Sequence, residues 1–163
     1  MKTLDYFKEF WFIAYHNLLD MLTIQILLVE DNEGDVFLIQ EGLENTSISS
    51  VLNVAKDGME AITFLNEKLE KDKPNLPDLI LLDINLPKRN GHEVLQYIKY
   101  SNELRHLPVV ILTTSNSPED VLSAYYHYAN GYITKPSGSG NLGDVVEQIE
   151  EYWLGLSQLP PKV

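Results

Sequence analysis

Polar residues that can do chemistry follow directly on short apolar runs of this sequence. There are five of them: Glu30 and Asp31 after the run 24–29, Asp83 after 79–82, Thr113 after 109–112, and Lys135 after 131–134. Three carboxylates brought into one crevice repel each other unless a cation joins them. Magnesium suits such a site, because it prefers oxygen ligands and keeps positions open for water or a phosphate oxygen.

The types of these residues suit the transfer of a phosphoryl group. The carboxylate of Asp83 can act as a nucleophile and form an aspartyl phosphate. The ammonium group of Lys135 is a compact charge for a phosphate oxygen, and the hydroxyl of Thr113 can donate a hydrogen bond to the same group. Since phosphoryl transfer needs mainly in-line positioning and neutralisation of charge, these residue types are sufficient for that reaction.

The apolar runs predict strands, and the segments between them predict helices. Strands are expected at 24–29, 51–55, 79–82, 109–112 and 131–134, as in a parallel sheet covered on both faces. Helices are expected at 36–43, 61–69, around 94–98, from Ser117-Pro118 onward, and at 142–156, with an exposed loop over 67–77. This alternation predicts an α/β domain with a doubly wound, flavodoxin-like, five-stranded parallel sheet of order 2-1-3-4-5. The carboxyl ends of its strands meet in one crevice, which brings the polar residues together.

Four segments carry a resemblance to a known family. They are Leu27–Asp31, Leu81–Pro87 with Gly91, Leu112–Thr114 and Gly131–Pro136. In this order and spacing they resemble the CheY-like receiver domains of bacterial response regulators, over about Ile24 to Trp153. The resemblance implies a phosphoprotein of a two-component phosphorelay that receives its phosphoryl group from a sensor histidine kinase.

The resemblance also implies a role for each matched position near the phosphoryl group. Asp83 matches the phosphoacceptor. Asp31 matches the main carboxylate ligand of the magnesium ion, with Glu30 as the second acid and the main-chain carbonyl of Asn85 as a further ligand.

Four matched positions concern the response to phosphorylation. Thr113 matches the switch hydroxyl, Tyr132 the aromatic residue of the switch, and Lys135 the phosphate-binding lysine. Pro136 matches a proline that follows a cis peptide bond, so the Lys135–Pro136 bond is expected to be cis.

A narrower resemblance concerns the kinase partner. The loop 67–77, the stretch Thr113-Thr114-Ser115 and the ending 149–154 resemble the single-domain regulators of cyanobacterial and other bacterial phytochromes. The cognate kinase is therefore expected to be of the phytochrome type. The downstream protein cannot be named from the sequence.

Composition limits the remaining possibilities. The net charge is −12, which disfavours nucleic acid as a partner, and no apolar run is long enough for a membrane span. There is no cysteine, and the four histidines lack metal-ligand spacing, so they are expected to be solvated or partly packed. We expect a cytoplasmic protein with a helical N-terminal extension at 1–22, the receiver domain at 23–157 and a tail at 158–163.

An association surface is also expected. Trp153 and Leu156 exceed what one core face needs, which predicts a homodimer through the fourth helix (from Ser117), the fifth strand (131–134) and the fifth helix (142–156).

Two alternative functions stay open. An interaction module that is not phosphorylated can share the fold, although it would typically have lost Asp83, an acid or Lys135. A phosphatase of the haloacid-dehalogenase type also uses a strand-end aspartate with magnesium, but it needs a second aspartate where this chain has Asn85. We therefore expect a signalling domain and not an enzyme, with at most self-catalysed phosphorylation and dephosphorylation.

Overall fold

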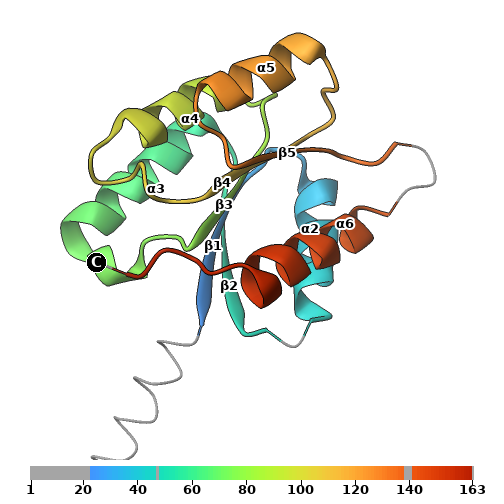
Figure 1. Ribbon diagram of the computed structural model, residues 1–163, viewed down its shortest axis with the longest axis horizontal. Coiled ribbons are helices and arrows are strands. Elements are labelled where there is room, and N and C mark those ends of the chain that lie inside the picture. The colour runs from blue at the N-terminus through green and yellow to red at the C-terminus, as the bar shows by residue number, and fades with distance from the viewer. Residues whose placement is uncertain (1–22, 47, 138–140, 163) are drawn as a thin grey trace, which may run out of the picture.

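The computed structural model describes residues 23–46, 48–137 and 141–162, and they form a five-stranded parallel sheet between two layers of helices (Figure 1). The strands are β1 (Ile24–Val29), β2 (Ser50–Ala55), β3 (Leu79–Leu82), β4 (Val109–Thr113) and β5 (Gly131–Thr134). Their order is β2-β1-β3-β4-β5, with every neighbouring pair parallel. The predicted fold class and strand order are confirmed.

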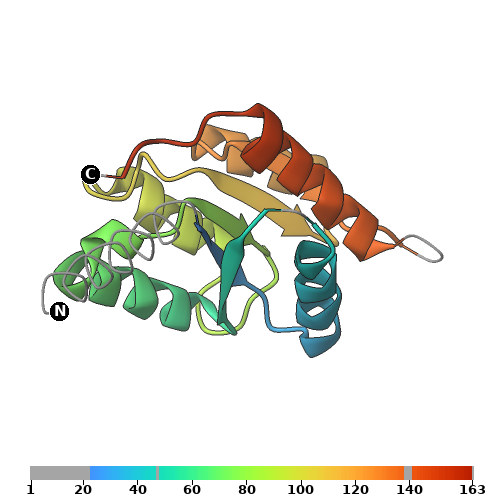
Figure 2. The same cartoon turned by 90° about the horizontal axis from the view of Figure 1, so that it is seen from below.

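Helices connect the strands and cover both faces of the sheet. They are α2 (Glu33–Glu44), α3 (Gly58–Lys71), the 3₁₀ turn η1 (Lys73–Asn75), α4 (Gly91–Tyr100), α5 (Pro118–Tyr126), α6 (Leu142–Glu150) and the π-helical η2 (Glu151–Leu156). Helix α2 packs beside α6 and α3 packs beside α4, on opposite sides of the sheet (Figure 2).

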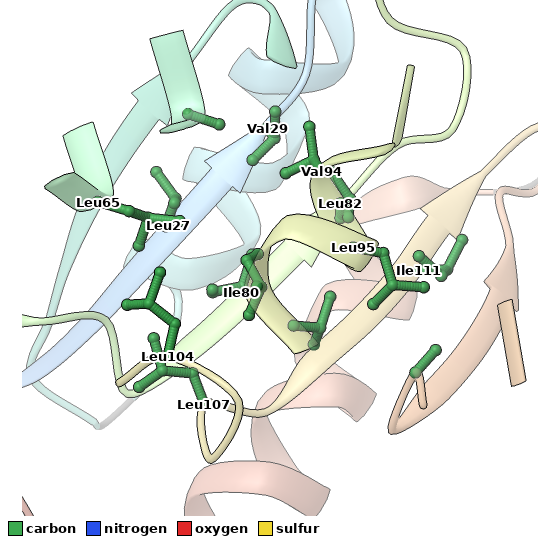
Figure 3. Packing of buried hydrophobic residues seen from close by; sticks show 14 of the residues in the cluster. Leu27, Val29, Leu65, Ile80, Leu82, Val94, Leu95, Leu104, Leu107 and Ile111 are labelled. Carbon is green, nitrogen blue, oxygen red and sulfur yellow. The ribbon is translucent and has the colours of Figure 1, made fainter. Parts of the chain in front are cut away.

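The core has two halves because successive side chains of a strand point to opposite faces of the sheet. Leu27, Val29, Ile80 and Leu82 lie on the face covered by α3 and α4, where they pack with residues such as Leu95 (Figure 3). The alternate residues of the same strands belong to the second cluster, with α2 and α6: Ile26, Leu28, Leu79 and Leu81. These inner strands are buried on both sides, which is why their sequence is apolar without alternation.

A polar side chain caps the N-terminus of each α-helix and fixes where the chain turns after a strand. The capping residues are Asn32, Asp57, Asn90, Ser117 and Asn141. Each side chain accepts a hydrogen bond from a main-chain N–H of the first turn, which would otherwise have no partner. These caps fix where each helix begins after a strand end, at the edge of the sheet where the polar residues lie.

The structure differs from the sequence-based expectation before β3. Helix α3 continues to Lys71, so the segment expected to be an exposed loop over 67–77 begins as helix. Lys68 donates to Asp72 at 2.6 Å across one turn, and both Lys68 and Lys71 lie near the helix C-terminus, where positive charge is favoured.

A second difference concerns the C-terminal segment. The expected amphipathic helix over 142–156 changes to π geometry at Glu151, which shifts the apolar pattern relative to the sheet. Trp153 packs partly against the second core cluster, whereas Tyr152 and Leu156 are exposed. The chain then runs back along the edge opposite the site, and Lys162 pairs with Asp78 at 3.4 Å.

The expected N-terminal extension over 1–22 lies outside the described residues. None of the described helices is both long and apolar enough to cross a membrane.

Candidate functional site

The carboxyl ends of β1, β3 and β5 meet around the ammonium group of Lys135. Its Nζ atom donates to Asp83 Oδ2 at 2.8 Å, to Glu30 Oε2 at 2.5 Å and to Asp35 Oδ2 at 2.9 Å. Lys135, Glu30 and Asp83 are buried, so these contacts are charge-assisted bonds with little solvent screening. The structure thus brings together the strand-end lysine and two of the strand-end acids that the sequence selected.

The carboxylate of Asp83 is held by groups from three segments. Besides Lys135, it accepts a hydrogen bond from the main-chain N–H of Asn85 at 3.0 Å, and the Thr113 hydroxyl lowers its pKa as a further donor group. All three are donors, which is the environment that keeps a buried carboxylate ionised. The Asp83 side chain is 7% exposed, so only a small part of it is open to solvent.

The loop after Asp83 is fixed by close packing and by an ion pair. A Cβ atom at Gly91 would lie 2.1 Å from the carbonyl oxygen of Asp83, so only glycine permits this approach. Lys88 has a φ of 63° and donates to Asp57 at 2.5 Å, which ties the loop to the start of α3. The position of Asn85, two residues after Asp83, depends on this arrangement.

The two buried carboxylates respond differently to their surroundings. Burial raises the pKa of Glu30, and the hydrogen bonds from Lys135 and Asn32 do not fully compensate for it. Burial acts on Asp83 in the same sense, but the hydrogen bonds from Lys135, Thr113 and Asn85 lower its pKa on balance. Burial would lower the pKa of Lys135, yet its three carboxylate partners raise it, so the ammonium group stays charged. Of the two carboxylates, Asp83 is therefore the one whose surroundings favour the ionised form.

Asp31 and the carbonyl of Asn85 complete the set of oxygen atoms suited to a divalent cation. Asp31 is exposed, and its carboxylate makes no hydrogen bond to the other described residues. The described acids are not grouped around a ready metal position, because Lys135 lies among them. Three carboxylates bond one ammonium group here, and Asp31 follows Glu30 as a fourth acid, so an uncompensated negative charge remains. Donor type and charge both fit a hard cation beside Asp31.

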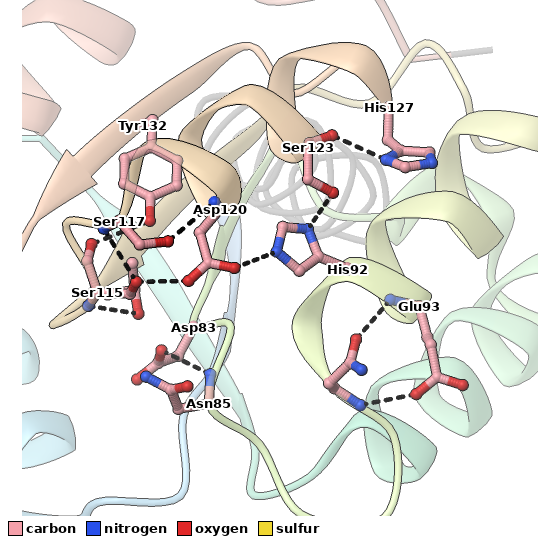
Figure 4. A network of polar contacts seen from close by, with 12 residues as sticks. Asp83, Asn85, His92, Glu93, Ser115, Ser117, Asp120, Ser123, His127 and Tyr132 are labelled. Atoms are coloured by element: carbon pink, nitrogen blue, oxygen red, sulfur yellow. Dashed lines mark hydrogen bonds and ion pairs between the residues drawn. The ribbon is translucent and has the colours of Figure 1, made fainter.

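A polar network extends from this site to α4 and α5 (Figure 4). Ser115 donates its main-chain N–H to Thr113 Oγ1 at 3.3 Å and its hydroxyl to Asp120 Oδ2 at 2.5 Å. Tyr132 donates its hydroxyl to the carbonyl of Ser115 at 2.9 Å. The nitrogen Nε2 of His92 lies 3.1 Å from Asp120 Oδ1. Tyr132, selected from the sequence as a switch residue, is thus in contact with the loop that follows Thr113.

Four residues of the site and its network had not been selected from the sequence: Asp35, Ser115, Asp120 and His92. Asp35 and Asp120 lie in the first turn of a helix that follows a strand end, where an acid reads as a partner of the helix dipole. Because this local role at a helix N-terminus already explains both acids, nothing in the sequence indicates that they belong to the site. The histidines were expected to be solvated or partly packed. His92 is partly packed, and its ring takes part in this polar network.

The expectation of a cis bond between Lys135 and Pro136 is wrong. No cis peptide bond occurs in the described residues, and both Lys135 and Pro136 are among them. A trans bond is the lower-energy form even before proline, and the contacts of Lys135 are reached with it.

Comparison with known proteins identifies the family. Residues 26–147 match the family model of the response regulator receiver domain. The chain is 43% identical over 135 residues to response regulator Rcp1 of Synechocystis sp., which covers 83% of this chain and 92% of Rcp1. It is equally identical, over the same length, to the probable methanogenesis regulatory protein FilR2 of Methanothrix harundinacea, with 86% of that protein covered.

Solved structures agree with this likeness. The phosphorylated cyanobacterial phytochrome response regulator RcpA has a TM-score of 0.80 and 43% identity, with 85% of this chain and 99% of RcpA covered. The Mn²⁺-bound form of Rcp1 has a TM-score of 0.79 and 42% identity at the same coverage. Receiver domains are signalling domains and not enzymes in the ordinary sense. From its fold, its site and these comparisons, the chain belongs to the family of response regulator receiver domains.

Proposed function

We propose that this receiver accepts a phosphoryl group from a histidine kinase on Asp83, with the help of a divalent cation. The observation that carries the proposal is the environment of Asp83: a carboxylate with a lowered pKa, surrounded by donors, at the strand end that faces Lys135. In the proposed reaction a carboxylate oxygen of Asp83 attacks phosphorus. The bond from phosphorus to the donor breaks, and the donor leaves with the electron pair.

The residues around Asp83 divide the work of positioning. In this proposal Lys135, whose Nζ lies 2.8 Å from Asp83 Oδ2, pairs with one phosphoryl oxygen, and the Thr113 hydroxyl donates to another. The carboxylate of Asp31 and the carbonyl of Asn85 are the groups that would hold the cation, together with Asp83. A bound cation supplies neutralisation of the charge that gathers on the transferring group. We propose magnesium as the cellular ion; Rcp1, 42% identical, is described in a Mn²⁺-bound form.

We propose a phytochrome-type kinase as the partner. The relatives Rcp1 and RcpA support this choice, since RcpA is described as a phytochrome response regulator. The equal identity to FilR2 supports a kinase of another type as the second candidate. Comparing the rates of phosphotransfer from a light-regulated phytochrome kinase and from a kinase without a chromophore separates the two. The proposal also includes a cytoplasmic location, where the kinase has access to ATP.

The decisive experiment compares the wild type with Asp83→Asn. Incubation with acetyl phosphate and Mg²⁺ should add the mass of one phosphoryl group to the wild type and none to the variant, as measured by intact-protein mass spectrometry. The amide is a weak nucleophile of nearly the same shape, so the variant should keep the circular dichroism spectrum of the wild type. An equal mass gain in both proteins would remove Asp83 from this role.

The same experiment addresses the two alternatives. A receiver-like module that is not phosphorylated would show no mass gain in the wild type, even with excess donor and Mg²⁺. A phosphatase of the haloacid-dehalogenase type would turn over phosphate esters, for which Asn85 offers no general acid.

A further inference from the structure

Three hydrogen bonds, made by three different groups of Ser115, hold the loop after β4. The N–H of Ser115 donates to Thr113 Oγ1 at 3.3 Å, its hydroxyl donates to Asp120 Oδ2 at 2.5 Å, and its carbonyl accepts from the Tyr132 hydroxyl at 2.9 Å. Ser115 is half-buried, so these bonds are partly shielded from water. A residue bonded in this way has little freedom to turn, and its N–H keeps a fixed direction.

The bond from Ser115 has a consequence for the hydroxyl of Thr113. A hydroxyl group has one proton to donate and accepts through its lone pairs. When Thr113 Oγ1 accepts from the N–H of Ser115, its proton points elsewhere, and the lowered pKa of Asp83, to which Thr113 contributes, agrees with a proton directed into the site. Thr113 is fully buried, so no water competes for this proton. The direction of the Thr113 hydroxyl within the site therefore depends on where Ser115 is held.

Asp120 is a firm anchor for Ser115 because two helices fix its carboxylate. It lies in the first turn of α5, where its main-chain N–H is capped by Ser117 Oγ at 3.0 Å. His92, near the start of α4, contacts the other carboxylate oxygen at 3.1 Å (Figure 4). The hydrogen bonds from Ser115 and His92 lower the pKa of Asp120, so it is ionised near neutral pH and its bonds are charge-assisted.

We propose that Asp120 is a positioning residue, which holds Ser115 and thereby aims the hydroxyl of Thr113. This role rests on the proposed function, because the direction of that hydroxyl matters for phosphorylation only if Asp83 is the acceptor. His92 supports the same role from α4. Two residues, Ser115 and Thr113, stand between Asp120 and Asp83, and Asp120 does not touch the reacting atoms.

The experiment measures the rate at which the full chain gains a phosphoryl group from acetyl phosphate with saturating Mg²⁺. Asp120→Ala and Ser115→Ala should each slow this rate by about fivefold, which is what one ordinary hydrogen bond contributes. Ser115→Thr keeps the hydroxyl and should restore most of the rate. Glu119→Ala is the matched control: it removes an exposed acid from the same turn of α5 while keeping Asp120, Ser115 and the bond between them, so its rate should equal that of the wild type.

A purely structural role of Asp120 would slow the reaction whether or not the Thr113 hydroxyl is present. The decisive measurement is therefore how the effect of Asp120→Ala depends on Thr113. In a Thr113→Ala background, Asp120→Ala should cause no further loss of rate, because the hydroxyl that Asp120 aims is absent. A fivefold loss in both backgrounds would overturn the proposal, and so would an unchanged rate for Ser115→Ala. If Asp120→Ala fails to fold by circular dichroism, Ser115→Ala in the two backgrounds gives the same test. A wild type that gains no phosphoryl group contradicts the proposed function, whereas a reactive wild type with additive variants contradicts only this inference.

Discussion

One ammonium group organises the residues at the carboxyl edge of the sheet. Lys135 contacts three acids that come from the end of β1, the start of α2 and the end of β3. These contacts balance one charge and leave the exposed carboxylate of Asp31 without a partner among the described side chains. The two neighbouring acids of this strand end are thus unequal: Glu30 is engaged by the protein, and Asp31 is available to a ligand.

This inequality predicts different effects on metal binding. Asp31→Ala should weaken Mg²⁺ binding by at least about tenfold, the lower end of what even the outer partners of a metal ligand contribute. Glu30→Ala should weaken it less, since the Glu30 carboxylate is directed to Lys135 and the main-chain N–H of Asn32. Calorimetric titration of the two variants and the wild type measures the difference. Equal affinities for the wild type and Asp31→Ala would show that Asp31 is not a ligand.

The helices decide which polar groups are buried away from the site. On α6, Glu150 is 2% exposed, and Thr46, which follows α2, donates its hydroxyl to Glu150 Oε1. The other oxygen, Oε2, has no hydrogen-bond partner among the described residues. Burial raises the pKa of Glu150, so the folded state binds this proton more tightly than the unfolded state does. The stability that follows is fully present below the unfolded pKa and is lost as pH rises through the folded pKa.

At neutral pH the buried carboxylate of Glu150 is therefore destabilising. Glu150→Gln should raise the free energy of unfolding at pH 7 by about 1 kcal/mol, the lower end of the cost of an unsatisfied buried group. The advantage should shrink as pH falls, because the wild-type side chain becomes protonated. Urea denaturation of both proteins at neutral and mildly acidic pH measures this. Glu151→Gln, at an exposed neighbour, should change little at either pH. A constant difference between Glu150→Gln and the wild type across pH would contradict the assignment.

At the scale of the whole molecule, the sheet leaves β5 as an edge strand between α5 and α6. Exposed apolar side chains lie on these helices and the segment after them: Leu122, Tyr125, Tyr126 and Leu156. Trp153, which the sequence analysis placed on this surface, packs partly into the core instead, so the exposed residues are better probes of association.

We predict a two-fold dimer through α5, β5 and α6. Leu122→Glu and Leu156→Glu should each give a folded monomer, because a buried charge in the contact would lack a partner. Phe37→Glu, on exposed apolar surface of α2, should leave the dimer intact and serves as the matched control. Light scattering with and without beryllofluoride and Mg²⁺ measures the mass. A wild type that is monomeric at micromolar concentrations in both conditions would exclude the dimer.

The proposed domain limits predict that residues before Met21 are dispensable for the chemistry. Among the described residues, the two core clusters begin at Ile24, and the family match begins at residue 26. A chain that begins at Met21 should give the circular dichroism spectrum of the receiver fold and gain a phosphoryl group at the rate of the full chain. An unfolded spectrum would place part of the core before Met21.

The sequence by itself determined the elements and their order, because apolar periodicity and helix caps are local signals. Strands β1, β3 and β5 begin and end where their apolar runs do, and Asp83 and Lys135 follow from their places at strand ends. Helix ends were less predictable. Helix α3 continues to Lys71 through a charged segment whose composition is equally typical of an exposed loop. The change to π geometry at Glu151 gave no signal in the spacing of apolar residues.

Only the tertiary structure decided which polar groups meet. Lys135 bonds Glu30 and Asp35 across separations of 105 and 100 residues, and His92 meets Asp120 across 28. Each of these side chains has an ordinary local explanation as a turn residue, a helix-dipole partner or a solvated group. The energy of their contacts depends on distance and burial, and both are set by how the helices pack on the sheet. For that reason the residues of the site could be chosen from the sequence, while the network that holds them became visible only in the fold.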